Sequence, residues 1–119
     1  MDYYTVNLPE GANVTILEDS EMRIKWFEKR IPNLHVCRNV KKFKEYFRGN
    51  PPCDFVFWDH DLGTKETGAD AAKWFKTRYS TTNRAHLIHS FNQAGARHIQ
   101  AEITAAVHIP FGEFEVTFV

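Results

Sequence analysis

The segment Phe55–Trp58 constrains the fold more than any other part of the chain. It is a run of large apolar residues with no polar residue between them, preceded by Asn50-Pro51-Pro52 and followed at once by Asp59. A strand with one face in water alternates apolar and polar residues, whereas an unalternating apolar strand is typical of a parallel sheet covered on both faces. The chain must therefore supply further strands beside this segment and helices over both faces.

Shorter apolar runs recur along the chain and alternate with helical patterns. Further strands are predicted at Val14–Leu17, Leu34–Cys37, His86–His89 and Ala106–Ile109. Between the runs, apolar residues recur at helical spacing, as at Ile24, Phe27 and Ile31, and helix caps are expected at Asn39, Thr67 and Asn92. This alternation favours βαβ units, and so an α/β fold built on a parallel sheet.

The length of the chain is typical of one domain. Its 119 residues, 43% of them hydrophobic, can bury a core without disulfide bonds or a structural metal ion. Residues 1–119 are therefore predicted to form one domain, with its core at about 13–111. The tail from Glu113 alternates polar and apolar residues and is too short for another βα unit. Residues 1–9 and 112–119 are therefore predicted as flanking strands, and the tail strand is expected to pair with Tyr3–Leu8.

Charge and cysteine content exclude several partners. Lysine plus arginine equals aspartate plus glutamate, 15 against 15, so general nucleic-acid binding is not expected. No apolar stretch approaches the roughly 20 residues that span a bilayer, so no membrane association is expected. Cys37 and Cys53 have neither metal-site nor disulfide-framework spacing. These features predict a cytoplasmic protein.

Acidic residues follow two of the predicted strands directly. Glu18 and Asp19 come after the first apolar run, and Asp59 and Asp61 come after the third. In a flavodoxin-like sheet these two strands are neighbours, and ligands bind beyond their carboxyl ends. Clustered carboxylates repel one another unless a cation neutralises them, and oxygen ligands suit Mg²⁺ or Mn²⁺. The four acids are thus predicted metal ligands, although Asp19 or Ser20 also suits a helix cap.

Four stretches together resemble a known family. VTILEDSEMR, CDFVFWDHDLG, LIHSF and IPF have the order and spacing found in receiver domains, the phospho-accepting modules of response regulators, and the likeness runs from about Val14 to Phe111. The resemblance implies a flavodoxin-like three-layer sandwich with a five-stranded sheet of order 2-1-3-4-5. It also implies that Glu18 and Asp19 bind a metal, that Asp59 accepts phosphate, and that Ser90 contacts the phosphoryl group.

Two departures separate the chain from ordinary receivers. Ile109 stands where receivers carry a lysine before proline, and the ending GEFEVTFV replaces their last helix with a terminal strand. In addition, His60-Asp61-Leu62-Gly63 and His89-Ser90-Phe91-Asn92 resemble the DHDLG and HSxN signatures of a divergent branch, the cyclic-phosphate-processing receiver domain. That resemblance implies processing of a cyclic phosphate on a nucleotide or related ligand.

The implied reaction assigns roles to residues near the acids. His60 and His89 can exchange protons near neutral pH, and Asp59 is either a nucleophile or a metal ligand. Asn92 caps a helix whose first amides can also receive an anion. The predicted catalytic residues are Asp59, His60, His89, Ser90 and Asn92.

Two other functions remain open from the sequence. One is a signalling receiver that is phosphorylated on Asp59, which the loss of lysine at Ile109 disfavours. The other is a non-catalytic module that keeps the fold and binds another protein. The exposed edges of the flanking strands are templates for strand pairing, so they are the predicted contact in any homodimer.

Overall fold

The predicted sheet is present in the computed structural model, which describes residues 3–119. The strands of the chain, which belong to two sheets, are β1 (Tyr4–Leu8), β2 (Val14–Leu17), β3 (Leu34–Cys37), β4 (Phe55–Trp58), β5 (Ala85–Ile88), β6 (Val107–His108) and β7 (Phe114–Phe118). Its helices are α1 (Glu21–Glu28), α2 (Val40–Arg48), α3 (Gly68–Lys76) and α4 (Gln93–Glu102). No helix within residues 3–119 has the length and apolar character to cross a membrane. Met1 and Asp2, which begin the predicted strand 1–9, lie outside the described residues.

The main sheet has the predicted topology. It contains five strands in the order β3-β2-β4-β5-β6, and every neighbouring pair is parallel. Counted from β2, this is the order 2-1-3-4-5, so the flavodoxin-like α/β fold is confirmed. The central strands β2 and β4 lie side by side, which brings together the ends that carry Glu18 and Asp59.

Some element ends differ from the sequence prediction. β6 covers only Val107–His108, and α1 ends at Glu28. Ile31 continues the helical spacing of α1 in the sequence, but it lies just after the turn that follows this helix, and its side chain is buried. Pro32 follows it directly, and a residue before proline is disfavoured in helical conformation.

Each expected helix cap is present. The side chains of Ser20, Asn39 and Asn92 accept hydrogen bonds from the first-turn amides of α1, α2 and α4. At α3 the carboxylate of Asp70 accepts the backbone N–H of Thr67 at 2.7 Å. These caps satisfy amides that a helix start leaves without partners, and they fix where each helix begins relative to the strand before it.

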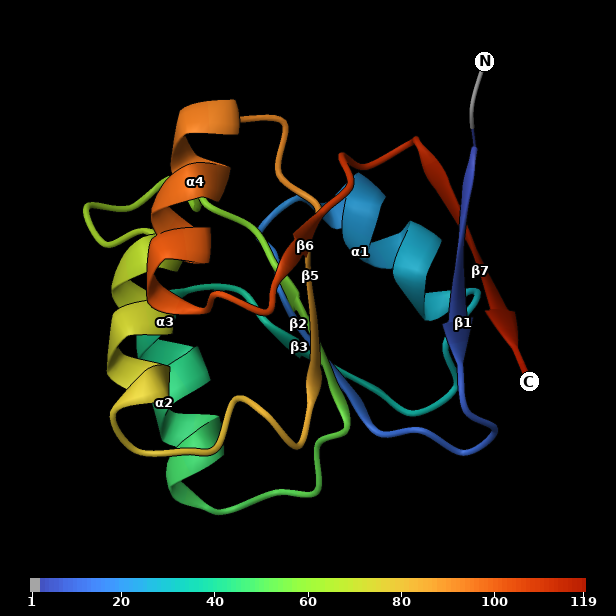
Figure 1. Ribbon diagram of the computed structural model, residues 1–119, viewed down its shortest axis with the longest axis horizontal. Coiled ribbons are helices and arrows are strands. Elements are labelled where there is room, and N and C mark those ends of the chain that lie inside the picture. The colour runs from blue at the N-terminus through green and yellow to red at the C-terminus, as the bar shows by residue number, and fades with distance from the viewer. Residues whose placement is uncertain (1–2) are drawn as a thin grey trace.

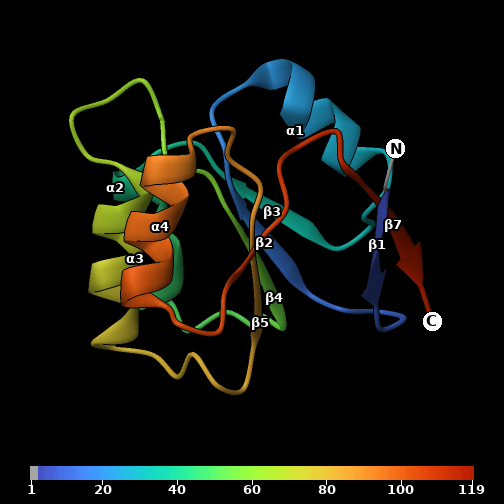
Figure 2. The same ribbon diagram turned by 45° about the horizontal axis from the view of Figure 1, so that its top comes forward.

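The sheet is covered by different elements on its two faces (Figures 1 and 2). Val56 and Trp58 of β4 pack with residues of α2, α3 and α4, whereas Phe55 and Phe57 pack with α1, β1 and β7. Successive side chains of a strand point to opposite faces, so the unalternating run fills both cores at once. These are the two covered faces that the sequence of β4 requires.

The terminal strands form a separate two-stranded parallel sheet. β1 pairs with β7 in the register Tyr4 with Phe114 to Leu8 with Phe118, which confirms the predicted pairing. Phe114 is buried, and its ring lies 6.0 Å from that of Phe57. This ribbon covers the sheet beside α1, and residues 109–119 after β6 contain the strand β7 and no helix.

Both cysteines belong to the core beneath α2 and α3. Cys37 and Cys53 are free thiols and are buried. Burial raises the pKa of Cys37 to about 12, with a smaller contribution from the neighbouring Cys53. A thiol with such a pKa stays protonated and behaves as a small apolar side chain.

Candidate functional site

Three polar residues form one row beyond the ends of the central strands. Glu18, Asp59 and His89 directly follow β2, β4 and β5, and the ladder continues through them: Asp59 N donates to Leu17 O at 3.2 Å and His89 N donates to Trp58 O at 3.0 Å. Because strand side chains alternate, all three point to the face covered by α1. One ligand atom from each lies within 4.8 Å of the others, and all three residues are buried.

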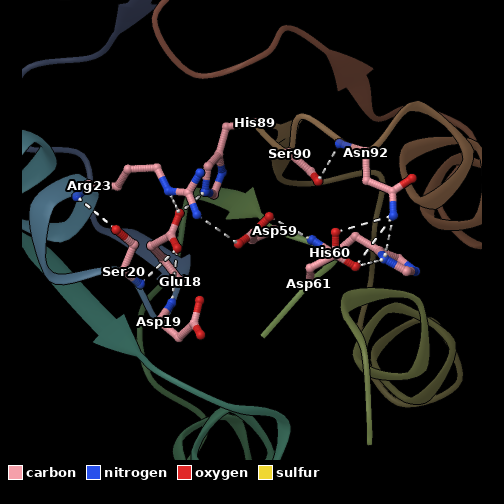
Figure 3. A network of polar contacts seen from close by, with 10 residues as sticks. All are labelled: Glu18, Asp19, Ser20, Arg23, Asp59, His60, Asp61, His89, Ser90 and Asn92. Carbon is pink, nitrogen blue, oxygen red and sulfur yellow. Dashed lines mark hydrogen bonds and ion pairs between the residues drawn. The ribbon is translucent and has the colours of Figure 1, made fainter. Parts of the chain in front are cut away.

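Glu18 is fully engaged by hydrogen-bond donors (Figure 3). Its Oε2 accepts the backbone N–H groups of Asp19 and Ser20, both at 3.0 Å. Its Oε1 lies 2.8 Å from His89 Nε2 and 3.0 Å from Arg23 Nε. Burial alone raises the pKa of Glu18, but the hydrogen bond and charge of His89, then the Ser20 amide and Arg23, outweigh it and hold the pKa below its usual value. Glu18 is therefore a charged carboxylate, and each of its two oxygens has a polar partner.

Asp59 is also buried, but only one of its two carboxylate oxygens accepts a hydrogen bond from residues 3–119. Its Oδ1 accepts the backbone N–H of His60 at 2.9 Å, whereas Oδ2 has no hydrogen-bond partner among residues 3–119 and lies 4.0 Å from Arg23 Nη2. Burial raises the pKa of Asp59 to about 6; the charge of Glu18 adds to this, and those of His89 and Arg23 oppose it. A carboxylate in this state has a strong demand for a proton or a cation.

His89 lies within the core with only one ring nitrogen bonded. Its Nε2 faces the Glu18 carboxylate, which can only accept, so Nε2 carries the hydrogen. Its Nδ1 is buried without a hydrogen-bond partner in the described chain. The rings of Phe27 and Phe57 flank the imidazole, with centroids at 5.3 and 6.2 Å. His89 thus orients Glu18 from the apolar side of the cluster.

Arg23 is the site residue that the sequence prediction missed. It lies in the first turn of α1, and its guanidinium spans Glu18 and Asp59. It supplies a positive charge beside Asp59 from α1, whereas Ile109, which directly follows β6 and stands where receivers carry a lysine, is buried and apolar. The sequence feature that points to Arg23 is its position three residues after the cap Ser20, inside the stretch EDSEMR. We call Glu18, Arg23, Asp59 and His89 the inner cluster.

His60, Asp61 and Asn92 form a second group, here called the outer cluster. His60 Nδ1 donates to Asp61 Oδ1 at 2.8 Å, and Asn92 Nδ2 donates to Asp61 Oδ2 at 3.2 Å. The hydrogen bond from His60 lowers the pKa of Asp61, whose side chain is 66% exposed. His60 also borders a groove of about 480 Å³ between α3 and α4. Its ring therefore points away from the inner cluster, and only its backbone contacts Asp59.

Two glycines allow α3 and α4 to approach the loop after β4. A Cβ on Gly68 would lie 1.8 Å from the carbonyl oxygen of Asp59, and a Cβ on Gly95 would lie 2.3 Å from Cγ of His60. Both distances are far below van der Waals contact. Glycine at these helix starts thus sets the positions of Asp59 and His60.

The remaining predicted residues lie around these clusters. Ser90 is buried, and its Oγ accepts the backbone N–H of Asn92 at 3.1 Å. Asp19 is exposed beside Gly63, where a Cβ would lie 3.2 Å from Asp19 Oδ2. Of the four predicted metal ligands, Glu18 and Asp59 converge with His89, whereas Asp19 and Asp61 lie outside that group.

The sequence matches one family over most of its length. Residues 15–105 match the family described as "Cyclic-phosphate processing Receiver domain". This range includes every residue of the inner and outer clusters. The chain has no match among curated proteins.

Solved structures of response regulators share the fold. The phosphorylated cyanobacterial phytochrome response regulator RcpA superposes with a TM-score of 0.69 at 15% identity, covering 83% of this chain and 79% of that one. The Mn²⁺-bound form of response regulator Rcp1 gives 0.64 at 14% identity, covering 83% and 80%. A probable two-component response regulator/GGDEF domain protein gives 0.68 at 14% identity, covering 87% of this chain and 45% of that one. At these identities the likeness establishes the fold.

Proposed function

The chain belongs to the cyclic-phosphate-processing receiver domain family, and from this premise we propose that it binds a divalent metal ion beside Asp59 and opens a cyclic phosphate on a nucleotide or related ligand. The observation that carries the proposal is Asp59 Oδ2, a buried carboxylate oxygen to which no donor in residues 3–119 is hydrogen-bonded, next to Glu18 and His89. A buried carboxylate in that state is stabilised by a cation.

The donor set fits a divalent ion. Glu18 and Asp59 offer carboxylate oxygens, which suit Mg²⁺ and Mn²⁺. His89 Nε2 would have to release the hydrogen that it directs at Glu18 before it could bind an ion, and a nitrogen ligand suits Mn²⁺ better than Mg²⁺. The Mn²⁺-bound form of the similarly folded Rcp1 agrees with a metal site in this fold. Asp59 has a free oxygen, but Oε1 of Glu18 already contacts Arg23. An ion bound to Glu18 would therefore displace the guanidinium.

Opening a cyclic phosphate breaks one of its ester bonds. In hydrolysis, water adds to phosphorus, the released alcohol oxygen takes a proton, and a phosphomonoester results. A bound divalent ion would draw negative charge from the phosphate oxygens. Asp59, whose pKa burial raises to about 6, would take a proton from the attacking water and could pass it to the released alcohol oxygen. In the alternative, Asp59 Oδ2 would attack phosphorus, the ester bond to the released alcohol would break, and water would then hydrolyse the aspartyl phosphate.

Two side chains are suited to hold the phosphate. Arg23 carries a guanidinium that is free to bind phosphate once an ion neutralises Glu18 and Asp59. Ser90 Oγ accepts the N–H of Asn92, so its own hydrogen remains available to a phosphate oxygen. His60 and Asn92 bind Asp61, and we assign them to positioning the loop beside the phosphate.

The test is turnover of a cyclic nucleotide. The protein is incubated with adenosine 2′,3′-cyclic phosphate and either Mg²⁺ or Mn²⁺, and the linear monophosphate is measured by chromatography. Asp59→Asn is expected to remove the activity. Asp54→Asn is the matched control because Asp54 lies just before the opposite end of β4. No linear product with either ion, or equal loss in both variants, contradicts the proposal.

A second candidate function is phosphorylation of Asp59. Its free Oδ2 at the end of β4 favours this candidate, and the similarly folded RcpA was solved in a phosphorylated form. Arg23 would have to replace the lysine lost at Ile109 as the cation beside the phosphoryl group. Treatment with acetyl phosphate and Mg²⁺, followed by intact mass measurement, tests it; a mass unchanged by the treatment rules it out.

A further inference from the structure

Phe91 is an exposed aromatic residue between two candidate site residues. Its side chain is 61% exposed, although it follows Ser90 and precedes Asn92. The large apolar residue of the neighbouring loop, Leu62, is 3% exposed. A single exposed apolar residue is ordinary on a protein surface, so its position has to carry the argument.

Phe91 and the inner cluster share one guanidinium. Cζ of Arg23 lies 5.5 Å from the centroid of the Phe91 ring. The same side chain lies 3.0 Å from Glu18 and 4.0 Å from Asp59. The ring is therefore separated from the proposed phosphate site by the width of one side-chain head group. In a nucleoside 2′,3′-cyclic phosphate, the base is likewise separated from the phosphorus only by the ribose.

The Phe91 ring contacts an aromatic ring and a guanidinium. Phe111 meets it at 6.5 Å with an interplanar angle of 87°. Phe111 is itself packed against Trp26 at 5.2 Å and Phe27 at 5.9 Å. The perpendicular contact with a packed aromatic group holds the Phe91 ring, and the Arg23 guanidinium lies over that ring, while 61% of the side chain remains exposed. A rigid, solvent-accessible aromatic face is the arrangement on which nucleobases stack.

We propose that Phe91 is the stacking platform for the base of a nucleoside cyclic phosphate. This inference rests on the proposed function and narrows it: the substrate carries an aromatic base, and base-free cyclic phosphates are poor substrates. Arg23 lies between the two ends of such a ligand, so it can bind the phosphate while it remains beside the stacked base. Purine substrates are favoured over pyrimidine substrates because the larger base covers more of the ring.

The experiment compares adenosine 2′,3′-cyclic phosphate with glycerol 1,2-cyclic phosphate. In the Phe91→Ala variant, the ratio of kcat/KM for the adenosine substrate to that for the glycerol substrate is expected to fall about 5- to 150-fold, the range given by 1–3 kcal/mol per stacked base. Phe91→Trp is expected to restore the ratio. Tyr4→Ala, which removes an exposed aromatic side chain from β1, is the matched control and leaves the ratio unchanged. An unchanged ratio in Phe91→Ala overturns the inference.

A binding measurement separates this inference from the proposed function. Adenosine 2′-monophosphate and glycerol phosphate are titrated into the wild-type protein and Phe91→Ala in the presence of Mn²⁺. If the wild type opens neither cyclic substrate, the proposed function fails, but tighter binding of the adenosine ligand that is lost in Phe91→Ala still supports stacking. Equal binding of both ligands, or binding that does not depend on Phe91, refutes it.

Discussion

The inner and outer clusters have similar residues at the same end of the sheet, yet their environments are opposite. In the inner cluster, Glu18 and Asp59 are buried and contact Arg23. In the outer cluster, Asp61 is mostly exposed and is bonded by His60 and Asn92. The inner cluster pairs two carboxylates with an imidazole, and the outer cluster pairs one carboxylate with an imidazole. Burial is what differs, and burial decides how strongly a charge demands a partner.

The alternation of strand side chains produces this difference. Asp59 continues the direction of Phe55 and Phe57, toward α1. His60 continues the direction of Val56 and Trp58, so its ring packs over Gly95 at the start of α4. Consecutive residues therefore enter different chemical environments. The predictions below test whether the clusters are as separate as their geometry indicates, beginning with the largest expected effect.

Alanine at the two close glycines is expected to damage the clusters unequally. Gly68→Ala sets a Cβ against the Asp59 carbonyl oxygen, which is backbone and cannot move alone, so the free energy of unfolding should fall by about 3 kcal/mol or more. Gly95→Ala meets the His60 ring, which can rotate, so the loss should be about 1 kcal/mol. Denaturant unfolding measures both.

Gly49→Ala is the control for these substitutions. A Cβ there meets a backbone oxygen at an ordinary 3.4 Å, and the change should stay within about 0.5 kcal/mol. Equal losses at Gly68 and Gly95 would show that the approach of α3 to Asp59 is no tighter than that of α4 to His60.

Removing the charge of Asp59 is expected to stabilise the fold. The pKa of Asp59 is raised by burial from its usual 3.8 to about 6, so the folded state carries a cost whenever the group is ionised. Asp59→Asn should increase the free energy of unfolding at pH 7.5 by about 1–3 kcal/mol without added metal. Asp61→Asn, at an exposed carboxylate, should change it by less than about 0.5 kcal/mol. A lower free energy of unfolding in Asp59→Asn would contradict the conclusion that the ionised Asp59 carboxylate destabilises the folded state.

The stabilisation by Asp59→Asn should depend on pH in a defined direction. A raised pKa means that the folded state holds the proton more tightly, so the wild type loses stability as pH rises from about 4 to about 6. The difference between variant and wild type should be small near pH 4 and reach its full value above pH 6. Unfolding curves measured at intervals across this window test it, and a difference that grows on acidification would reverse the assigned shift.

The sequence predicted part of the inner cluster for two reasons. A short stretch of sequence shows where a strand ends, and the side chains of a strand alternate between the two faces of the sheet. The run Phe55–Trp58 located Asp59, and the matching run before Glu18 located its neighbour. His89 was expected as a catalytic residue, and the register adds that it lies in the same row as the two acids. Asp61 was predicted as a ligand of the same metal site, but the chain leaves the strand before it, so the alternation of strand side chains does not fix where it points, and it lies outside the group of Glu18, Asp59 and His89. Arg23 was missed because its position three residues after Ser20 places it only in the first turn of α1, and the direction of its long side chain depends on the tilt of that helix.

Divalent metal is expected to compete with Arg23. The guanidinium partly neutralises Glu18 and Asp59, so an ion must overcome its charge and its contact with Glu18. Arg23→Gln should bind Mn²⁺ about tenfold more tightly than the wild type, equal to about 1.4 kcal/mol. Lys25→Gln, on an exposed position of the same helix, is the control and should change the affinity by less than about twofold. Weaker binding in Arg23→Gln would indicate that the ion and the guanidinium do not share the site.

The smallest expected effect is that of Asp61 on metal affinity, and it decides whether two clusters exist. Asp59 is a proposed buried ligand, so Asp59→Asn should weaken Mn²⁺ binding about 100-fold. Asp61 is exposed and holds the hydrogen bonds of His60 and Asn92, so Asp61→Asn should weaken binding only about twofold through the loss of a screened charge. Calorimetric titration of both variants measures this. Comparable losses would mean that the loop after β4 turns Asp61 inward when the ion binds, and the two clusters would then be one site.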